Sequence, residues 1–128
     1  MSTDKDRRVA ITAEALYLLN LLLLPGIAFI WLLLLNRRHH SNASPLVLCH
    51  LRQTVAASIW AGMLLVPVTI LTITVGGYES IGAWSIAIIY FIICHSSLIL
   101  LGVFGLSRAM AGQTWRYPLI GPACGNTQ

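Results

Sequence analysis

Apolar and polar stretches alternate along the chain and divide it into four segments and a tail. The segments cover residues 11–35, 36–44, 45–75 and 83–111, and the tail covers 112–128. Pro25-Gly26 interrupts the first apolar segment, and the second segment, NRRHHSNAS, is polar and basic. The third and fourth are long and apolar enough to cross a membrane as helices. The pattern predicts an all-α chain with two clear spans.

Residues at the ends of the long segments are typical of helix boundaries. Ser44 is the expected N-cap of the 45–75 helix, and Pro45 suits its first helical position. Gly112 is expected to end the 83–111 helix. The 45–75 helix would extend about 46 Å, whereas the hydrocarbon core is about 30 Å thick. We therefore expect its first turns at the headgroup level and its true span nearer residues 54–75.

Composition places the chain in a membrane. Of its 128 residues, 57% are hydrophobic and only 9% are charged, and the mean hydropathy is +0.79. Soluble domains carry about 25% charged residues, so these few charges could hardly cover a water-soluble fold. We expect one integral membrane domain over residues 1–128. The excess of basic residues then indicates membrane topology rather than nucleic-acid binding.

The distribution of charge favours one topology over another. If residues 11–35 form a re-entrant hairpin broken at Pro25-Gly26, one side of the membrane holds all eight Lys and Arg residues, and the positive-inside rule makes that side cytoplasmic. If residues 11–35 form one kinked span, the protein has three spans and the basic residues divide five against three. We favour two full spans plus the hairpin in a bacterial inner membrane, with the basic loop and the tail cytoplasmic.

Two groups of residues are expected at the cytoplasmic surface of the membrane. The first group consists of Arg37, Arg38, His50, Arg52 and Gln53. It could hold a lipid headgroup or an acidic partner segment, or it could form a solvated cap that anchors depth. The second group consists of Trp115, Arg116 and Tyr117. Aromatic rings and basic side chains of this kind gather at membrane interfaces.

His95 is the ionisable residue expected nearest the bilayer centre, which makes it a candidate functional residue. It could hold a pigment, a haem or a quinone, or it could hydrogen-bond across helices with help from Ser96 or Ser97. A haem held by both His50 and His95 is disfavoured. His95 is expected about 20 Å from the cytoplasmic end of its helix, whereas His50 is expected at the surface.

Small residues at four-residue spacing are candidates for close helix packing. They are Ala57, Ala61, Ser58, Gly62, Gly105 and Ala109. Whether they serve contacts within this chain or with another chain is left open by the sequence.

Signatures of catalysis and of metal binding are absent from the sequence. None of the four acidic residues, Glu14 among them, is placed as part of an intramembrane pair. No disulfide framework is expected from the three cysteines: Cys49 and Cys94 fit small buried hydrophobes, and Cys124 fits an exposed thiol. We expect a non-enzymatic protein with no metal and no cofactor of its own.

Three motifs carry a family resemblance: PGIAFIWLLLLNRR, SPLVLCHLRQTVAASI and RAMAGQTWRYPL. They resemble a widespread family of small bacterial membrane proteins of unknown function, distantly related to the twenty-kilodalton Tic component of chloroplast envelope import. The resemblance covers residues from about 12 to 120. The matching positions are Pro25, Trp31, Ser44, Pro45, His50, Gly112, Trp115, Arg116, Tyr117 and Pro118.

The resemblance implies a broken apolar hairpin followed by two long helices. The family usually has an acidic residue just before the histidine, where this chain has Leu48-Cys49. A charge pair formed by neighbours at that point is therefore not implied here. The family brings no established activity, so the resemblance informs architecture more than function.

Together these features favour a small accessory, structural or assembly subunit that packs against a larger membrane complex, in contact with the lipid bilayer and not with nucleic acid. Two alternatives stay open. One is a ligand-binding subunit that uses His95 for a pigment, a haem or a quinone. The other is a small transport or translocation component, which the Tic-like resemblance suggests. Colour retained on purification would favour the first alternative, and conductance in liposomes would favour the second.

Overall fold

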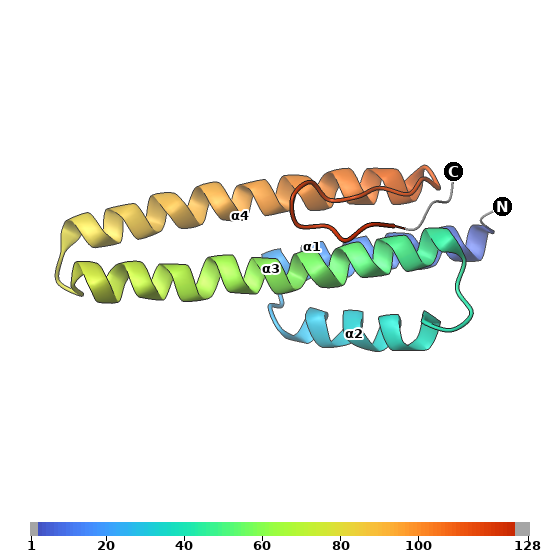
Figure 1. The fold of residues 1–128 in the computed structure, drawn as a ribbon, viewed down its shortest axis with the longest axis horizontal. Helices are drawn as coiled ribbons and strands as arrows, with labels where there is room; N and C mark the ends of the chain where they lie inside the picture. The colour runs from blue at the N-terminus through green and yellow to red at the C-terminus, as the bar shows by residue number, and fades with distance from the viewer. Residues whose placement is uncertain (1–2, 125–128) are drawn as a thin grey trace.

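The computed structural model describes residues 3–124, which form four helices and no strand. The helices are α1 (Asp4–Leu22), α2 (Ile27–His39), α3 (Pro45–Gly76) and α4 (Ile81–Met110). Figure 1 shows α3 and α4 as a long antiparallel pair, with α1 and α2 as a shorter hairpin against one end of it. Both α3 and α4 are long and apolar enough to cross a membrane. The predicted all-α chain with two span-length helices is confirmed.

Pro25-Gly26 divides the first apolar segment into two separate helices. Gly26 has a φ of 87°, which side chains of L-residues rarely adopt, and its N–H donates to Asn20 Oδ1 at 2.9 Å. The 19 residues of α1 and the 13 of α2 extend about 28 and 20 Å, so each is shorter than the hydrocarbon core. The break is therefore a tight reversal of the chain rather than a kink within one helix.

Helix α1 begins earlier than the apolar pattern indicates. The Thr3 hydroxyl accepts from the Asp6 N–H at 3.2 Å, and the Asp6 carboxylate accepts from the Thr3 N–H at 3.0 Å. This reciprocal capping box starts the helix before any apolar residue has appeared. The first turns are polar because they lie at the exposed end of the bundle. A helix start predicted from apolar residues alone therefore falls after these polar turns.

The packed core lies at one end of the molecule. Figure 1 shows that both termini and the α2–α3 connection lie at this end, while the α3–α4 turn lies at the other. Helix α1 contacts both α3 and α4 here, and α2 covers α1 and α3. Beyond the hairpin, α3 and α4 pack against each other and against no other described helix. Only 11% of the most apolar stretch of α3 and 17% of that of α4 are buried. The outer half of the pair therefore leaves most of its apolar side chains exposed on the surface of the molecule.

Two glycines of α4 let α1 approach closely. A Cβ atom on Gly102 would lie 2.6 Å from Leu18 Cδ2 and 2.7 Å from the Tyr17 ring, and a Cβ on Gly105 would overlap the Glu14 carboxylate. Both glycines are buried against α1. The small side chains on this face therefore make room for the two largest groups that α1 turns inward.

The residues expected at helix contacts lie mostly inside the bundle. Ala57, Ala61 and Ser58 of α3 are buried, as are Gly105 and Ala109 of α4. Gly62 differs, because it is exposed and a Cβ there would have no neighbour within 4 Å. It leaves open space rather than making a contact.

Gly102→Ala is expected to lower the free energy of unfolding by about 1–3 kcal/mol, because the added methyl group pushes into a ring and a side chain that are already packed. Gly62→Ala is the matched control and is expected to be neutral or slightly stabilising, since its methyl group enters open space on a helix. Thermal unfolding of the detergent-solubilised protein, followed by circular dichroism, measures both. Equal midpoints for the two variants would contradict the close α1–α4 approach.

Candidate functional site

Glu14 is a fully buried acid at the centre of the packed end. It lies on the face of α1 formed by Ala10, Ala13, Glu14 and Tyr17, whose spacing places all four on one side of the helix. The alanines and the Gly105 notch on α4 bring the neighbouring backbones close to the carboxylate. A buried carboxylate is costly unless it is paired and hydrogen-bonded. The surrounding side chains provide that pairing.

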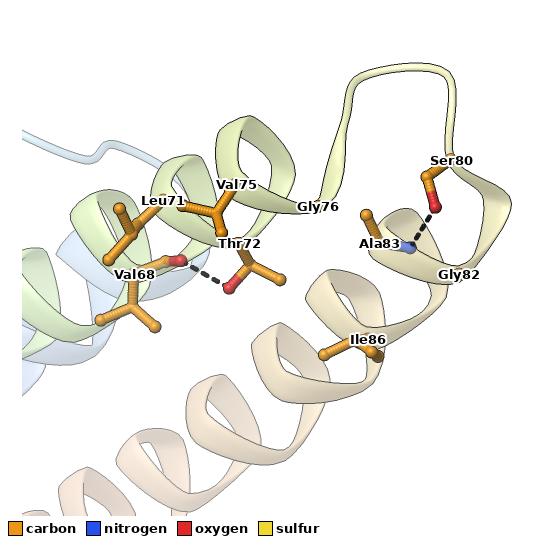
Figure 2. Close-up of a pocket in the computed structure, with 9 residues that line it drawn as sticks. All are labelled: Val68, Leu71, Thr72, Val75, Gly76, Ser80, Gly82, Ala83 and Ile86. Atoms are coloured by element: carbon orange, nitrogen blue, oxygen red, sulfur yellow. Dashed lines mark hydrogen bonds between the residues drawn. The ribbon is translucent and has the colours of Figure 1, made fainter.

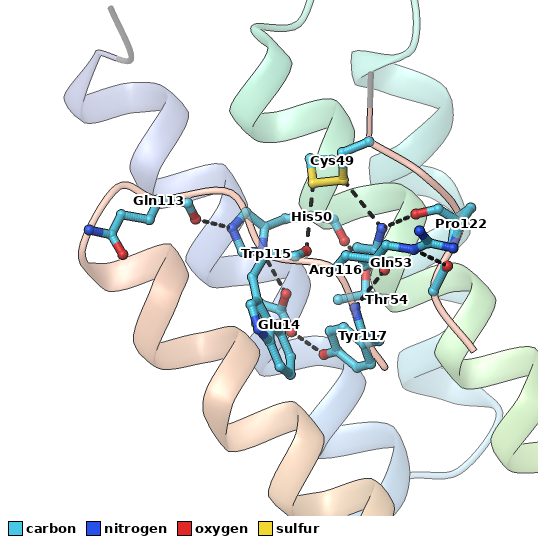
Figure 3. The surroundings of a disulfide bond; sticks show 12 residues. Glu14, Cys49, His50, Gln53, Thr54, Gln113, Trp115, Arg116, Tyr117 and Pro122 are labelled. Carbon is cyan, nitrogen blue, oxygen red and sulfur yellow. Dashed lines mark hydrogen bonds and ion pairs between the residues drawn. A yellow bond between two sulfur atoms is a disulfide. The ribbon is translucent and has the colours of Figure 1, made fainter. Parts of the chain in front are cut away.

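His50 and Tyr117 engage the two carboxylate oxygens of Glu14, as Figure 3 shows. His50 Nδ1 lies 2.6 Å from Glu14 Oε1, and the Tyr117 hydroxyl donates to Oε2. His50 Nε2 lies 2.8 Å from the backbone oxygen of Gln113, which can only accept, so Nε2 carries a proton. A second proton lies between Nδ1 and the carboxylate. The network joins α1, α3 and the tail through one acid.

The electrostatics of the network follow from its burial. Removal from water raises the pKa of Glu14, and the hydrogen bonds from His50 and Tyr117 oppose that rise. Burial and the nearby Glu14 carboxylate also raise the pKa of Tyr117, so its hydroxyl stays protonated and serves as a donor. Proton sharing with His50 lets the acid remain inside the protein.

Gln53 fixes the backbone of the tail in the same region. Its side-chain oxygen accepts from the Tyr117 N–H at 3.0 Å, and its Nε2 donates to the Pro122 oxygen at 2.5 Å. A Cβ on Gly121 would overlap the Gln53 side-chain oxygen, so only glycine fits where the tail crosses α3. The tail is thus held by a side chain that binds main-chain groups on both sides of Gly121.

A disulfide joins Cys49 of α3 to Cys124 of the tail (Figure 3). The prediction that no disulfide forms, with Cys124 as an exposed thiol, is therefore wrong. The two cysteines are 75 residues apart in sequence and meet only because the tail folds back over α3. Closing a loop of this length stabilises a folded chain by about 4 kcal/mol in the chain-entropy account.

The tail turns back at a Schellman motif after α4. Gly112 has a φ of 69°, its N–H donates to Ala109 O at 3.0 Å, and the Gln113 N–H donates to Arg108 O at 2.9 Å. Figure 1 shows the tail then returning along the helices. Trp115 packs against Phe104 and against Tyr117, with ring centroids 6.2 and 4.9 Å away. The helix stop expected at Gly112 therefore also directs the tail into the bundle.

The structure separates the predicted surface residues into buried and exposed sets. His50, Gln53 and Tyr117 are 0% exposed, so they contact neither lipid headgroups nor an external partner, contrary to their predicted surface position. Arg37, Arg38, Arg52 and Arg116 are exposed, and Trp115 is half-buried. All of these residues belong to elements that meet at the packed end of the molecule. The sequence pattern does not show that the tail folds over His50 and Gln53.

Sequence reasoning missed Glu14 as the partner of His50. The expectation followed neighbours in sequence, where Leu48-Cys49 offers no acid, but the acid comes from α1 across the bundle. The available signal was an acidic residue within an apolar helix, on the same face as Ala10, Ala13 and Tyr17. An acid on a small-residue face is costly without a base to pair with it.

His95 lies in α4, outside this network. Its Nδ1 is buried and has no hydrogen-bond partner, and its ring stacks on Phe91 with a centroid distance of 5.3 Å and an interplanar angle of 16°. The expected hydrogen bond across helices is not formed by His95 Nδ1, and the Ser97 hydroxyl donates to Ile93 O of its own helix. A haem shared with His50 does not fit either, since both His50 ring nitrogens are engaged.

A groove of about 570 Å³ lies beside the α3–α4 turn, at the far end from Glu14 (Figure 2). Its walls are largely apolar, and its hydroxyl groups are already engaged. Thr72 donates to Val68 O at 2.8 Å, and Ser80 accepts from the Ala83 N–H at 3.2 Å. The groove therefore suits lipid tails better than a polar ligand. Within residues 3–124, no group of three or more His, Cys, Asp or Glu side chains could hold a metal ion.

His50→Leu is expected to lower the free energy of unfolding by about 3–5 kcal/mol, because it leaves the Glu14 carboxylate buried without its base. The double variant Glu14→Leu/His50→Leu is expected to recover most of this loss, since it removes both groups. Arg52→Leu, two residues along α3 and exposed, is the control and should stay within about 0.5 kcal/mol. Denaturant unfolding in detergent measures all three. A double variant as unstable as His50→Leu would contradict the pairing.

Comparison with known protein families identifies the chain. A family model for MamF/MmsF, described as the magnetosome magnetite crystal formation protein family, matches residues 5–124. No curated protein and no solved structure matches the chain significantly. The Tic-like resemblance drawn from the three motifs is therefore wrong, because the family model covers the same region and places it elsewhere. The chain belongs to the MamF/MmsF family of magnetosome membrane proteins involved in magnetite crystal formation.

Proposed function

We propose that this chain is a non-enzymatic accessory protein of the magnetosome membrane that supports magnetite crystal formation through contacts with other membrane components. The observation that carries the proposal is the contrast between its two ends. One end is a packed bundle held by the hydrogen bonds of Glu14, His50, Tyr117 and Gln53. From this bundle α3 and α4 extend as a pair of apolar helices that bury little of their surface. The family match over residues 5–124 supplies the cellular process.

The basic residues support an orientation with the packed end toward the cytoplasm. Figure 1 places the start of α1, the α2–α3 connection, the end of α4 and the tail together, and seven of the eight Lys and Arg residues lie in these regions or in the helix turns beside them. The eighth, Arg52, lies near the start of α3. Helices α1 and α2 then enter the cytoplasmic leaflet and return, as a re-entrant hairpin shielded by α3 and α4. The short turn that contains Glu79 lies on the opposite side.

The disulfide adds a consequence to this orientation. The cytosol keeps most thiols reduced, so Cys49 and Cys124 would be a dithiol there in growing cells. Oxidation would then tie the tail covalently to α3. The polar contacts of Gln53 and Tyr117 hold the tail in either redox state.

The accessory role is supported by how little of the apolar surface the chain buries within itself. Side chains such as Ile59, Met63, Ile89 and Phe104 are about half exposed on α3 and α4. In a membrane these faces contact lipid or another membrane protein, so the chain acts by packing. A conduit would need a continuous polar face along the spans, and the hydroxyls of Thr72 and Ser97 bond to their own helices instead.

Deletion of the chain from a magnetite-forming bacterium tests the proposed function. We expect crystals of altered size or number by electron microscopy, restored by the wild-type chain and by the exposed-surface control Arg52→Leu. His50→Leu is expected to fail to restore them, because the packed end no longer holds together. Mild-detergent purification of the tagged chain should also recover a stoichiometric larger membrane protein. Unchanged crystals in the deletion strain would overturn the proposal.

Cysteine labelling tests the orientation. Asn42→Cys and Glu79→Cys are each placed in a chain whose three native cysteines are alanine. On inside-out membrane vesicles, which expose the cytoplasmic face, a membrane-impermeant maleimide should label the cysteine at position 42. The cysteine at position 79 should react only after detergent is added. The reverse pattern would mean that the basic end faces the vesicle interior.

A further inference from the structure

A cavity of about 510 Å³ lies where the α1–α2 connection meets α3 and α4. Its walls are mostly apolar side chains, with three polar residues among them. The residues that carry the argument are Asn20, Phe29, Ser58, Gly62, Phe91 and His95. The volume lies in the range of small-molecule sites, which are apolar with a few placed polar groups. The cavity is separate from the Glu14 network.

Two buried polar atoms, one on each of two residues that line this cavity, have no hydrogen-bond partner. They are Ser58 Oγ and His95 Nδ1, and Ser58 is only 5% exposed. A serine inside a helix commonly bonds to the backbone oxygen four residues earlier, as Ser97 does at 2.8 Å. Leaving a buried polar group unsatisfied costs about 1–3 kcal/mol. Two such atoms at one cavity point to a ligand that would satisfy them.

The walls favour a flat ligand. The rings of Phe91 and His95 lie nearly parallel, with an interplanar angle of 16°, and present stacked aromatic surface beside the cavity. Gly62 also lines the cavity and adds no side chain to it, and a Cβ there would have no neighbour within 4 Å. A planar ring can lie against such a wall with offset or edge contacts.

The depth of the cavity limits the ligand to molecules that dissolve in the membrane. Ser58 lies 13 residues after Pro45 (58 − 45), and His95 lies 13 residues before Arg108 (108 − 95). At about 1.5 Å per residue, both are about 20 Å from the basic end of the pair. A charged metabolite or an ion would have to cross apolar surface to reach this depth.

We propose that this cavity binds a planar, membrane-soluble carbonyl compound with the chemistry of a quinone headgroup. The Ser58 hydroxyl and the His95 Nδ1–H donate to its carbonyl oxygens, and the ring lies beside Phe91. A hydroxyl rotates to suit its acceptor, and a neutral imidazole carries its proton on Nδ1 in one of its two tautomers. This binding role goes beyond the accessory function and does not depend on it.

The test uses a matched pair of probes with the full chain in phosphatidylcholine nanodiscs. Duroquinone and durene share the same tetramethylated ring, but only duroquinone has carbonyl oxygens. Equilibrium dialysis against empty nanodiscs separates binding from partition into lipid. We expect saturable binding of about one duroquinone per chain, about tenfold tighter than durene, because one hydrogen bond is worth about 0.5–1.5 kcal/mol and two act together.

Variants of the cavity separate a built site from an apolar groove. His95→Phe and Ser58→Ala should each weaken duroquinone binding about two- to tenfold and leave durene unchanged. Gly62→Leu should abolish binding without loss of thermal stability, because its side chain fills open space. Ser97→Ala, outside the cavity on α4, is the control and should bind as the wild type does.

Two results would overturn the proposal. Equal affinity for duroquinone and durene, unaffected by His95→Phe, would show a groove for lipid tails only. Duroquinone uptake that survives Gly62→Leu, in a variant with a wild-type unfolding midpoint, would show partition into the bilayer rather than binding. Because the readout is dialysis of the purified chain, neither result depends on crystal formation.

Discussion

The structure depends on the burial of one carboxylate. Glu14 is fully buried, and the two groups that engage its carboxylate, His50 and Tyr117, come from α3 and from the tail. An acid left unpaired at this depth would cost several kcal/mol, which makes the three-element contact close to obligatory. The approach of α1 to α4 at Gly105 and the return of the tail to Tyr117 both accommodate that group.

This constraint also explains why the two ends of the molecule differ. Polar interactions are directional, so a network that joins α1, α3 and the tail defines one relative position of these elements. The outer half of α3 and α4 has apolar contacts, which constrain the position of the helices less, and most of its side chains are exposed. The protein thus combines a bundle with a polar centre and a helical pair that is long and apolar enough to cross a membrane. For an accessory membrane protein, this places specificity at the bundle and anchorage in the pair.

The cavity around Ser58 and His95 lies at the boundary between these two regions. Helices α1 and α2 stop at the Pro25-Gly26 reversal, so the space that they would fill further along the pair stays open. Ser58 and His95 keep unsatisfied polar atoms there, whereas Glu14, within the bundle, is fully engaged. The length of the hairpin therefore decides both where the bundle ends and where a membrane-soluble ligand can enter.

The sequence by itself indicated a membrane protein and the two long helices that follow the Pro25-Gly26 break. It also located the Ser44 N-cap and the end of α4 at Gly112. Each of these features depends on local composition or on backbone preferences within a few residues. The sequence did not determine the Glu14–His50 pair or the Cys49–Cys124 bond. Their members are 36 and 75 residues apart, and no periodicity links them. Only the tertiary structure brings them together, because the return of the tail and the close approach of α1 depend on packing among all the elements at once.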